Sequence, residues 1–119
     1  MRSRQEVGRS GEDLAVTYLE QRGWQVLDRN WFGRGGELDV VALDVACDTV
    51  VGVEVKTRRS TAYGRAAEAV TPVKLRRMRS LVAQWLDAHD LRCDGVRLDV
   101  IAIEHLRGAP PHLEHLRGV

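Results

Sequence analysis

Gly36-Glu37-Leu38-Asp39-Val40-Val41-Ala42 and Val51-Gly52-Val53-Glu54-Val55-Lys56 are the two stretches that decide the fold. Both are rich in apolar and β-branched residues, and the short polar segment 44–48 separates them. This pattern is typical of two antiparallel strands joined by a hairpin loop. The sequence therefore predicts a β-hairpin in the first half of the chain, around which the other elements are placed.

The pairing of the two strands follows by counting, with residues 45–48 as the loop. Asp39 then lies directly opposite Glu54, and Glu37 lies opposite Lys56. These four charged residues share one face of the hairpin. The other face pairs aliphatic side chains, with Leu38, Val40 and Ala42 against Val55, Val53 and Val51. A shift of one residue would place Asp39 and Glu54 on opposite faces, so the register is a definite prediction.

Two carboxylates on opposed strand positions repel each other. Their Cβ atoms are about 5 Å apart, and two like charges about 4 Å apart cost roughly 4 kcal/mol at an effective dielectric constant of 20. Either one carboxyl keeps its proton or a divalent cation lies between them. Carboxylate oxygens suit Mg²⁺ or Mn²⁺, and Lys56 is near enough to position a water or hold a phosphate. The alternative is a surface ion-pair cluster in which Glu37 and Lys56 neutralise each other.

The order of Asp39 and Glu54-Val55-Lys56 resembles the PD-(D/E)xK nuclease signature, although Leu38 stands where that signature has proline. The surrounding chain resembles the YraN-like bacterial family, which is similar to archaeal Holliday-junction resolvases. The matching residues span 7–103 and are Gly8, Gly11, Glu12, Ala15, Asn30, 36–39, 53–58, Gly64, Lys74 and 97–100. The resemblance implies a restriction-endonuclease-like fold and metal-dependent nuclease activity.

Length and composition indicate one globular domain. The chain has 119 residues, of which 44% are hydrophobic and 29% charged, as in ordinary folded proteins. No run of about 18 apolar residues predicts a membrane span, and the lack of a signal-peptide core favours the cytoplasm. The net charge is only +1, so a nucleic-acid-binding surface has to come from the distribution of charge. Cys47 and Cys93 lack metal-binding spacing and are expected to be reduced.

Residues 5–22 have the periodicity of an amphipathic helix, and Glu12 falls within its apolar stripe. The small residues Gly8, Gly11 and Ala15 beside it would let this helix approach the sheet closely. A carboxylate on such a stripe is costly unless it is paired or bound to a metal. The alternative is that Glu12 lies at the edge of the stripe and reaches water or an arginine. Gly23 ends the helix.

Basic residues gather after the hairpin. Segment 57–65 leaves directly from the strand that carries Glu54, and we expect a basic, flexible loop there. A helix follows from Pro72 to about residue 89, with Thr71 as its N-cap. Cations in its first two turns oppose the helix dipole. A phosphate backbone would compensate for this, and a solvated face is the alternative.

The remaining segments complete a sheet. Residues 24–30 predict a first strand, the glycine-rich stretch 33–36 a turn, and residues 96–104 a closing strand. Asp99 on that strand could join the metal site, but pairing with an arginine is favoured. Residues 105–119 are expected to form a loop or short extension beyond a domain of residues 1–104. Their three histidines could bind zinc, although no spacing requires it.

The element order αβββαβ, together with the resemblance, predicts an α/β fold with a restriction-endonuclease-like mixed sheet flanked by helices. On it, Glu12, Asp39 and Glu54 would hold Mg²⁺ or Mn²⁺. The catalytic residues would be Asp39, Glu54 and Lys56, and Glu37 would tune Lys56 without binding the ion.

Phosphate contacts are expected from Arg58, Arg59, Arg65, Lys74, Arg76 and Arg77. The predicted function is therefore a metal-dependent endonuclease on nucleic acid, with DNA favoured over RNA and branched or structured DNA as its substrate. The alternative is a nucleic-acid-binding or adaptor module on a nuclease fold, without turnover. Resemblance to junction resolvases also favours a homodimer.

Overall fold

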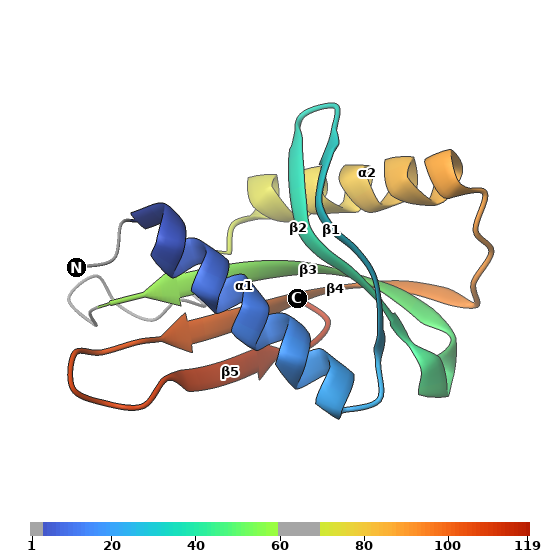
Figure 1. The fold of residues 1–119 in the computed structure, drawn as a ribbon. Coiled ribbons are helices and arrows are strands. Elements are labelled where there is room, and N and C mark those ends of the chain that lie inside the picture. The colour runs from blue at the N-terminus through green and yellow to red at the C-terminus, as the bar shows by residue number, and fades with distance from the viewer. Residues whose placement is uncertain (1–3, 60–69) are drawn as a thin grey trace.

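A five-stranded sheet with helices packed on both faces forms the molecule (Figure 1). The computed structural model describes residues 4–59 and 70–119, the side chains of residues 4–9 excepted. The elements are α1 (Arg4–Gln21), β1 (Gln25–Gly33), β2 (Gly36–Asp44), the 3-10 helix η1 (Val45–Cys47), β3 (Thr49–Arg58), α2 (Pro72–His89), β4 (Gly95–Glu104) and β5 (His112–Leu116). The strands lie in chain order, with β3 and β4 parallel and the other neighbours antiparallel. The prediction of a mixed α/β fold is confirmed.

Two apolar clusters, one on each face of the sheet, form the core. The cluster under α1 contains Ala15, Leu19, Trp24, Val40, Ala42, Val51, Val53, Ile101 and Ile103. The cluster under α2 contains Leu38, Val41, Val50, Met78, Leu81, Val82, Trp85 and Leu98. Val40, Val41 and Ala42 belong alternately to the two clusters, as expected for a strand that is buried on both faces.

Gly11 allows α1 to lie very close to β3. A Cβ atom added at Gly11 would overlap with the side-chain hydroxyl of Thr57. One turn later Ala15 is fully buried, so the predicted close approach is confirmed at these two positions. Gly23, with a φ of 85°, follows the end of the helix, also as predicted.

Helix α2 has the predicted ends. The Thr71 hydroxyl accepts a hydrogen bond from the Lys74 amide, Pro72 occupies the first turn, and Asp90 ends the helix in the left-handed conformation. The helix lies close to β3 at Gly52, where an added Cβ would be 2.5 Å from Val82 Cγ2. Within residues 4–59 and 70–119, no helix is long and apolar enough to cross a membrane.

The β1–β2 hairpin rises out of the sheet and reaches past α2 (Figure 1). Gln84 on α2 makes two hydrogen bonds to the backbone of Arg34, which lies in the turn between β1 and β2. Gln84 Oε1 accepts from the Arg34 amide at 2.8 Å, and Gln84 Nε2 donates to the Arg34 carbonyl at 3.1 Å. A Cβ at Gly33 would be 2.8 Å from Leu81 Cδ2, so a larger residue there would require neighbouring side chains to move. The tip of the hairpin is therefore fixed on α2.

The regular alternation of faces along β2 breaks at one point. Leu38 belongs to the cluster under α2, whereas Val40 belongs to the cluster under α1. The prediction that these two residues share a face is therefore wrong. The break lies opposite Asn30 of β1, which stands between the pairs Arg29–Val40 and Trp31–Leu38 and has a φ of 51°. A left-handed residue inside a strand interrupts the pleat and reverses the faces beyond it.

Residues 112–116 form the fifth strand, antiparallel to β4, so this segment is not the loop that was one of the two predictions. His115 Nε2 lies 2.7 Å from Asp99 Oδ2, and Arg97 Nε donates to Asp99 Oδ1 at 2.9 Å. Burial raises the pKa of Asp99, but hydrogen bonds from His115 and Arg97 outweigh it and lower the pKa to about 2. The predicted pairing of Asp99 with an arginine is confirmed, and this buried charge ties β5 to β4.

We expect Gly11→Ala to lower the free energy of unfolding, although this substitution inside a helix ordinarily raises it by about 0.5–1 kcal/mol. The added methyl group would overlap with Thr57, and overpacking of this kind costs about 1–3 kcal/mol. Urea denaturation measures the difference. Thr17→Ala, on the exposed side of α1, is the matched control and should not destabilise the protein. A more stable Gly11→Ala variant would contradict the close approach.

Candidate metal centre

The candidate site lies where β2 separates from β3. The two strands pair in the predicted register as far as Val40 and Val53. Asp39 and Glu54 occupy the next position of that register, at which the backbone pairing has ended. There a side chain takes the place of the backbone acceptor: Asp39 Oδ2 accepts a hydrogen bond from the Val55 amide at 2.8 Å. Asp39 is therefore fixed at the fork between the two strands.

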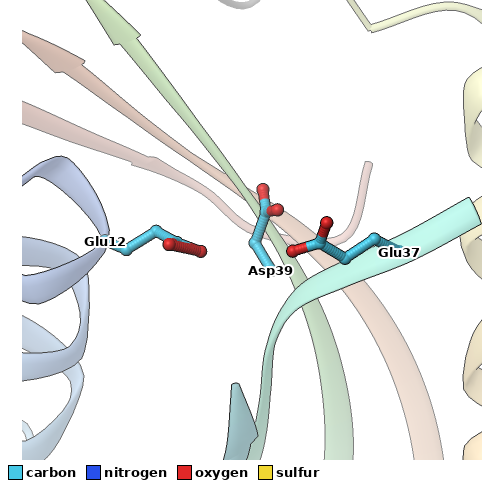
Figure 2. A group of neighbouring side chains, drawn as sticks. All are labelled: Glu12, Glu37 and Asp39. Atoms are coloured by element: carbon cyan, nitrogen blue, oxygen red, sulfur yellow. The ribbon is translucent and has the colours of Figure 1, made fainter. Parts of the chain in front are cut away.

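Three carboxylates converge at this fork. Glu12 on α1 and Glu37 and Asp39 on β2 each contribute one oxygen, and the three oxygens lie within 4.8 Å of one another. Figure 2 shows Glu12 and Glu37 pointing from opposite sides toward Asp39. Glu37 and Asp39 both come from β2, and their carboxylates are directed toward each other (Figure 2). The close packing of Gly11 on β3 brings Glu12 to them.

Asn30 joins two of these carboxylates. With its amide nitrogen turned toward them, Asn30 donates to Glu37 Oε1 at 2.7 Å and to Glu12 Oε1 at 2.8 Å. Sequence reasoning assigned no role in the site to this residue. An asparagine within a predicted strand could have indicated an irregular position, since asparagine tolerates the left-handed conformation that Asn30 adopts.

The fold leaves the carboxylates in mutual repulsion. Burial and the negative charge of Glu54 raise the pKa of Asp39 to about 7, with further contributions from Glu12 and Glu37, against the hydrogen bond from Val55. Burial also raises the pKa of Glu12, although the nearby Arg29 opposes the shift. Asp39 therefore holds its proton through much of the range in which a carboxyl group is normally ionised.

Glu54 lies beside the three carboxylates rather than among them. Its Oε1 is 2.8 Å from Lys74 Nζ on α2, and both side chains are largely buried. The structure therefore places Glu37 in the group for which the sequence proposed Glu54. The predicted pairing of Glu37 with Lys56 is wrong, because the β2–β3 ladder ends before it. Lys56 stays on β3, two residues after Glu54 and half-buried.

Five of the six predicted phosphate-binding residues lie on β3, directly after it, or on the first turns of α2. Arg58 is the last residue of β3 and Arg59 follows it, while Arg65 lies outside the described residues. Arg76 and Arg77 are exposed on the first turns of α2. Lys74 is engaged by Glu54, as described above.

The oxygen atoms of the site fit a hard divalent cation. Mg²⁺ and Mn²⁺ prefer carboxylate oxygens and complete their coordination with waters or phosphate oxygens. A proton on Asp39 and a cation among the carboxylates are two ways of relieving the same repulsion. The residues present therefore suit the ion that the resemblance implies.

We expect the stability of the metal-free protein to fall as the pH rises from about 4 to about 7. Asp39 ionises near its ordinary pKa of 3.8 in the unfolded chain but near 7 in the folded protein. Within this window the folded state keeps a proton that the unfolded state has lost, so rising pH favours unfolding, and the effect levels off above pH 7. Urea denaturation in chelator across this range measures it. Asp39→Asn should reduce the slope, and an unchanged slope would contradict the assignment.

Comparison with known proteins identifies the family. The family model described as "Uncharacterised protein family UPF0102" matches residues 11–103, which include Glu12, Glu37, Asp39 and Glu54. A UPF0102 protein of Mycolicibacterium gilvum (strain PYR-GCK) is 52% identical over 117 residues, covering 98% of this chain and 95% of its own length. A UPF0102 protein of Beutenbergia cavernae is 48% identical over 119 residues, covering 100% of this chain and 99% of its own length. The chain therefore belongs to the UPF0102 family.

Proposed function

We propose that this protein is a metal-dependent endonuclease that hydrolyses phosphodiester bonds in branched or structured DNA. The observation that carries the proposal is the convergence of Glu12, Glu37 and Asp39 within 4.8 Å. Two further observations support it: Glu54 and Lys56 follow on the neighbouring strand, and the pKa of Asp39 is raised to about 7. Perturbed carboxyl groups gathered in this way are typical of functional sites. The fold would then be of the restriction-endonuclease type, related to that of the junction resolvases.

The three carboxylates would hold Mg²⁺ or Mn²⁺, which supplies polarisation of the scissile phosphate and a lower pKa for water. Hydrolysis forms a bond between a water oxygen and phosphorus and breaks one phosphorus–oxygen ester bond. Lys56 would orient that water or stabilise the negative charge that develops on the phosphate oxygens. Asn30 would keep Glu12 and Glu37 in their positions through its two hydrogen bonds.

In the structure Glu54 and Lys74 are paired with each other, so neither is available to a metal or a phosphate. If Glu54 is to act on the metal and Lys74 on a phosphate, their 2.8 Å contact has to open. A substrate phosphate would attract Lys74, and the cation would attract Glu54, so binding of both would favour the exchange of partners. The arginines near the ends of β3 and the start of α2 would then contact neighbouring phosphates.

Asp39→Asn should abolish cleavage and leave the metal-free protein at least as stable as wild type. The substitution keeps an oxygen that can accept from the Val55 amide, while it removes a charge that Glu54, Glu12 and Glu37 repel. Mn²⁺ should raise the melting temperature of wild type but not of the variant, because only a folded state that binds the ion gains stability. Cleavage assays on branched, single-stranded and duplex DNA with Mg²⁺, Mn²⁺ or chelator complete the test.

Asp13→Asn is the matched control. Asp13 follows Glu12 on α1, but it is exposed and pairs with Arg29 at 2.7 Å outside the carboxylate group. This variant should cleave and respond to Mn²⁺ as wild type does. A wild-type protein that cleaves none of the substrates and does not respond to either metal would refute the enzyme proposal and favour an adaptor module.

Neutralising Arg76 and Arg77 with glutamine should weaken DNA binding equally for all sequences. Each lost phosphate contact should also reduce the slope of log affinity against log salt concentration by about one unit. Fluorescence anisotropy at several salt concentrations measures both effects. Arg92→Gln, on the exposed segment after α2, is the control. An unchanged slope in the Arg76 and Arg77 variant would mean that these side chains form a solvated face.

A further inference from the structure

Phe32 on β1 is the most exposed large apolar side chain in the part of the chain that the structure describes, at 73%. Its neighbours on β1 point the other way: Trp31 packs in the cluster under α2, and a Cβ at Gly33 would meet Trp31 and Leu81. Phe32 therefore contributes little to the core. A single exposed apolar side chain is ordinary on a protein surface, so the surroundings of Phe32 decide whether it has a role.

Phe32 lies next to the carboxylate group. It pairs directly with Glu37 across the β1–β2 ladder, and the Cβ atoms of directly opposed residues are about 5 Å apart on the same face. Glu37 in turn lies within 4.8 Å of Asp39 and Glu12. The exposed ring and the candidate metal ligands thus form one continuous surface.

The hairpin that carries Phe32 is held in place. Gln84 binds both the amide and the carbonyl of Arg34, two residues further along the chain. The close contact of Gly33 with Leu81 fixes the same tip. The ring is therefore presented from a rigid support, which lowers the entropic cost of binding a flat partner.

We propose that Phe32 stacks on an unpaired base of the nucleic-acid strand whose phosphate is cleaved at the carboxylate group. This inference rests on the nuclease function proposed above and narrows its substrate class to strands with an unpaired nucleotide beside the scissile phosphate, as in single strands, flaps and branch points. In a continuous duplex both faces of each base are already stacked, so such a ring has no base to contact. In a single strand every base offers a face, and aromatic side chains bind it with little sequence preference.

The test measures the affinity for single-stranded oligonucleotides by anisotropy, with Ca²⁺ in place of Mg²⁺ and gels to confirm that the DNA stays intact. Phe32→Ala should weaken binding about 5- to 150-fold, Phe32→Leu should weaken it similarly, and Phe32→Trp should retain it. The slope against salt should not change, since no phosphate contact is lost. Val45→Ala, 57% exposed and beyond the far end of β2, is the control and should bind as wild type.

A second set of oligonucleotides, each lacking one base, identifies the partner of the ring. When the missing base is the one that stacks, wild type and Phe32→Ala should bind alike, and that position should adjoin the cleaved bond. Equal losses for Phe32→Ala on every oligonucleotide and on duplex would overturn the proposal. So would conversion of a dimer to a monomer by Phe32→Ala in analytical ultracentrifugation, which would make Phe32 a contact between copies of the chain.

Binding, cleavage and the response to Mn²⁺ of the same proteins distinguish failure of the stacking proposal from failure of the nuclease proposal. If wild type cleaves DNA and is stabilised by Mn²⁺, but Phe32→Ala binds single strands as tightly as wild type, the stacking proposal alone is refuted. If wild type neither binds nor cleaves DNA and ignores Mn²⁺, the nuclease function is refuted and the stacking role with it.

Discussion

The hydrogen bond from the Val55 amide to the Asp39 carboxylate is the contact on which the site depends. Where β2 stops pairing with β3, the backbone of β3 needs another acceptor, and Asp39 supplies it. The bond holds Asp39 at the fork, with Glu12 on one side and Glu37 on the other (Figure 2). The same separation frees the β1–β2 hairpin to cross to α2, where Gln84 fixes its tip.

The pKa values of Asp39 and Asp99 are shifted in opposite directions. Asp99 is surrounded by Arg97 and His115, and its pKa falls to about 2. Around Asp39 the neighbours are carboxylates and Asn30, which donates hydrogen bonds to Glu12 without adding a positive charge. The polar atoms are satisfied while the repulsion remains. That combination supports the metal-binding role proposed above.

Counting along the hairpin predicted the β2–β3 register, because a strand buried on both faces tolerates no shift. It could not predict that the ladder ends at Val40, since that depends on a side chain replacing a backbone bond. Nor could it predict that Glu54 pairs with Lys74 on α2, which leaves Glu37 as the third carboxylate of the group. Strand β5 could not be predicted because it is held by pairing with β4 and by the contact of His115 with Asp99, neither of which a local pattern reveals.

β5 lies beyond residues 11–103, the range of the family match, yet it covers the edge of β4, a strand that lies almost entirely within that range. A chain ended at Glu104 would keep the whole carboxylate group. It would also uncover the backbone edge of β4, where exposed N–H and C=O groups invite pairing with other chains. Asp99 would lose two of its partners, the His115 ring and the Gly118 amide. A C-terminal fusion that pulls residues 112–118 from the sheet would therefore be expected to destabilise the β4 edge while leaving the carboxylate group in place.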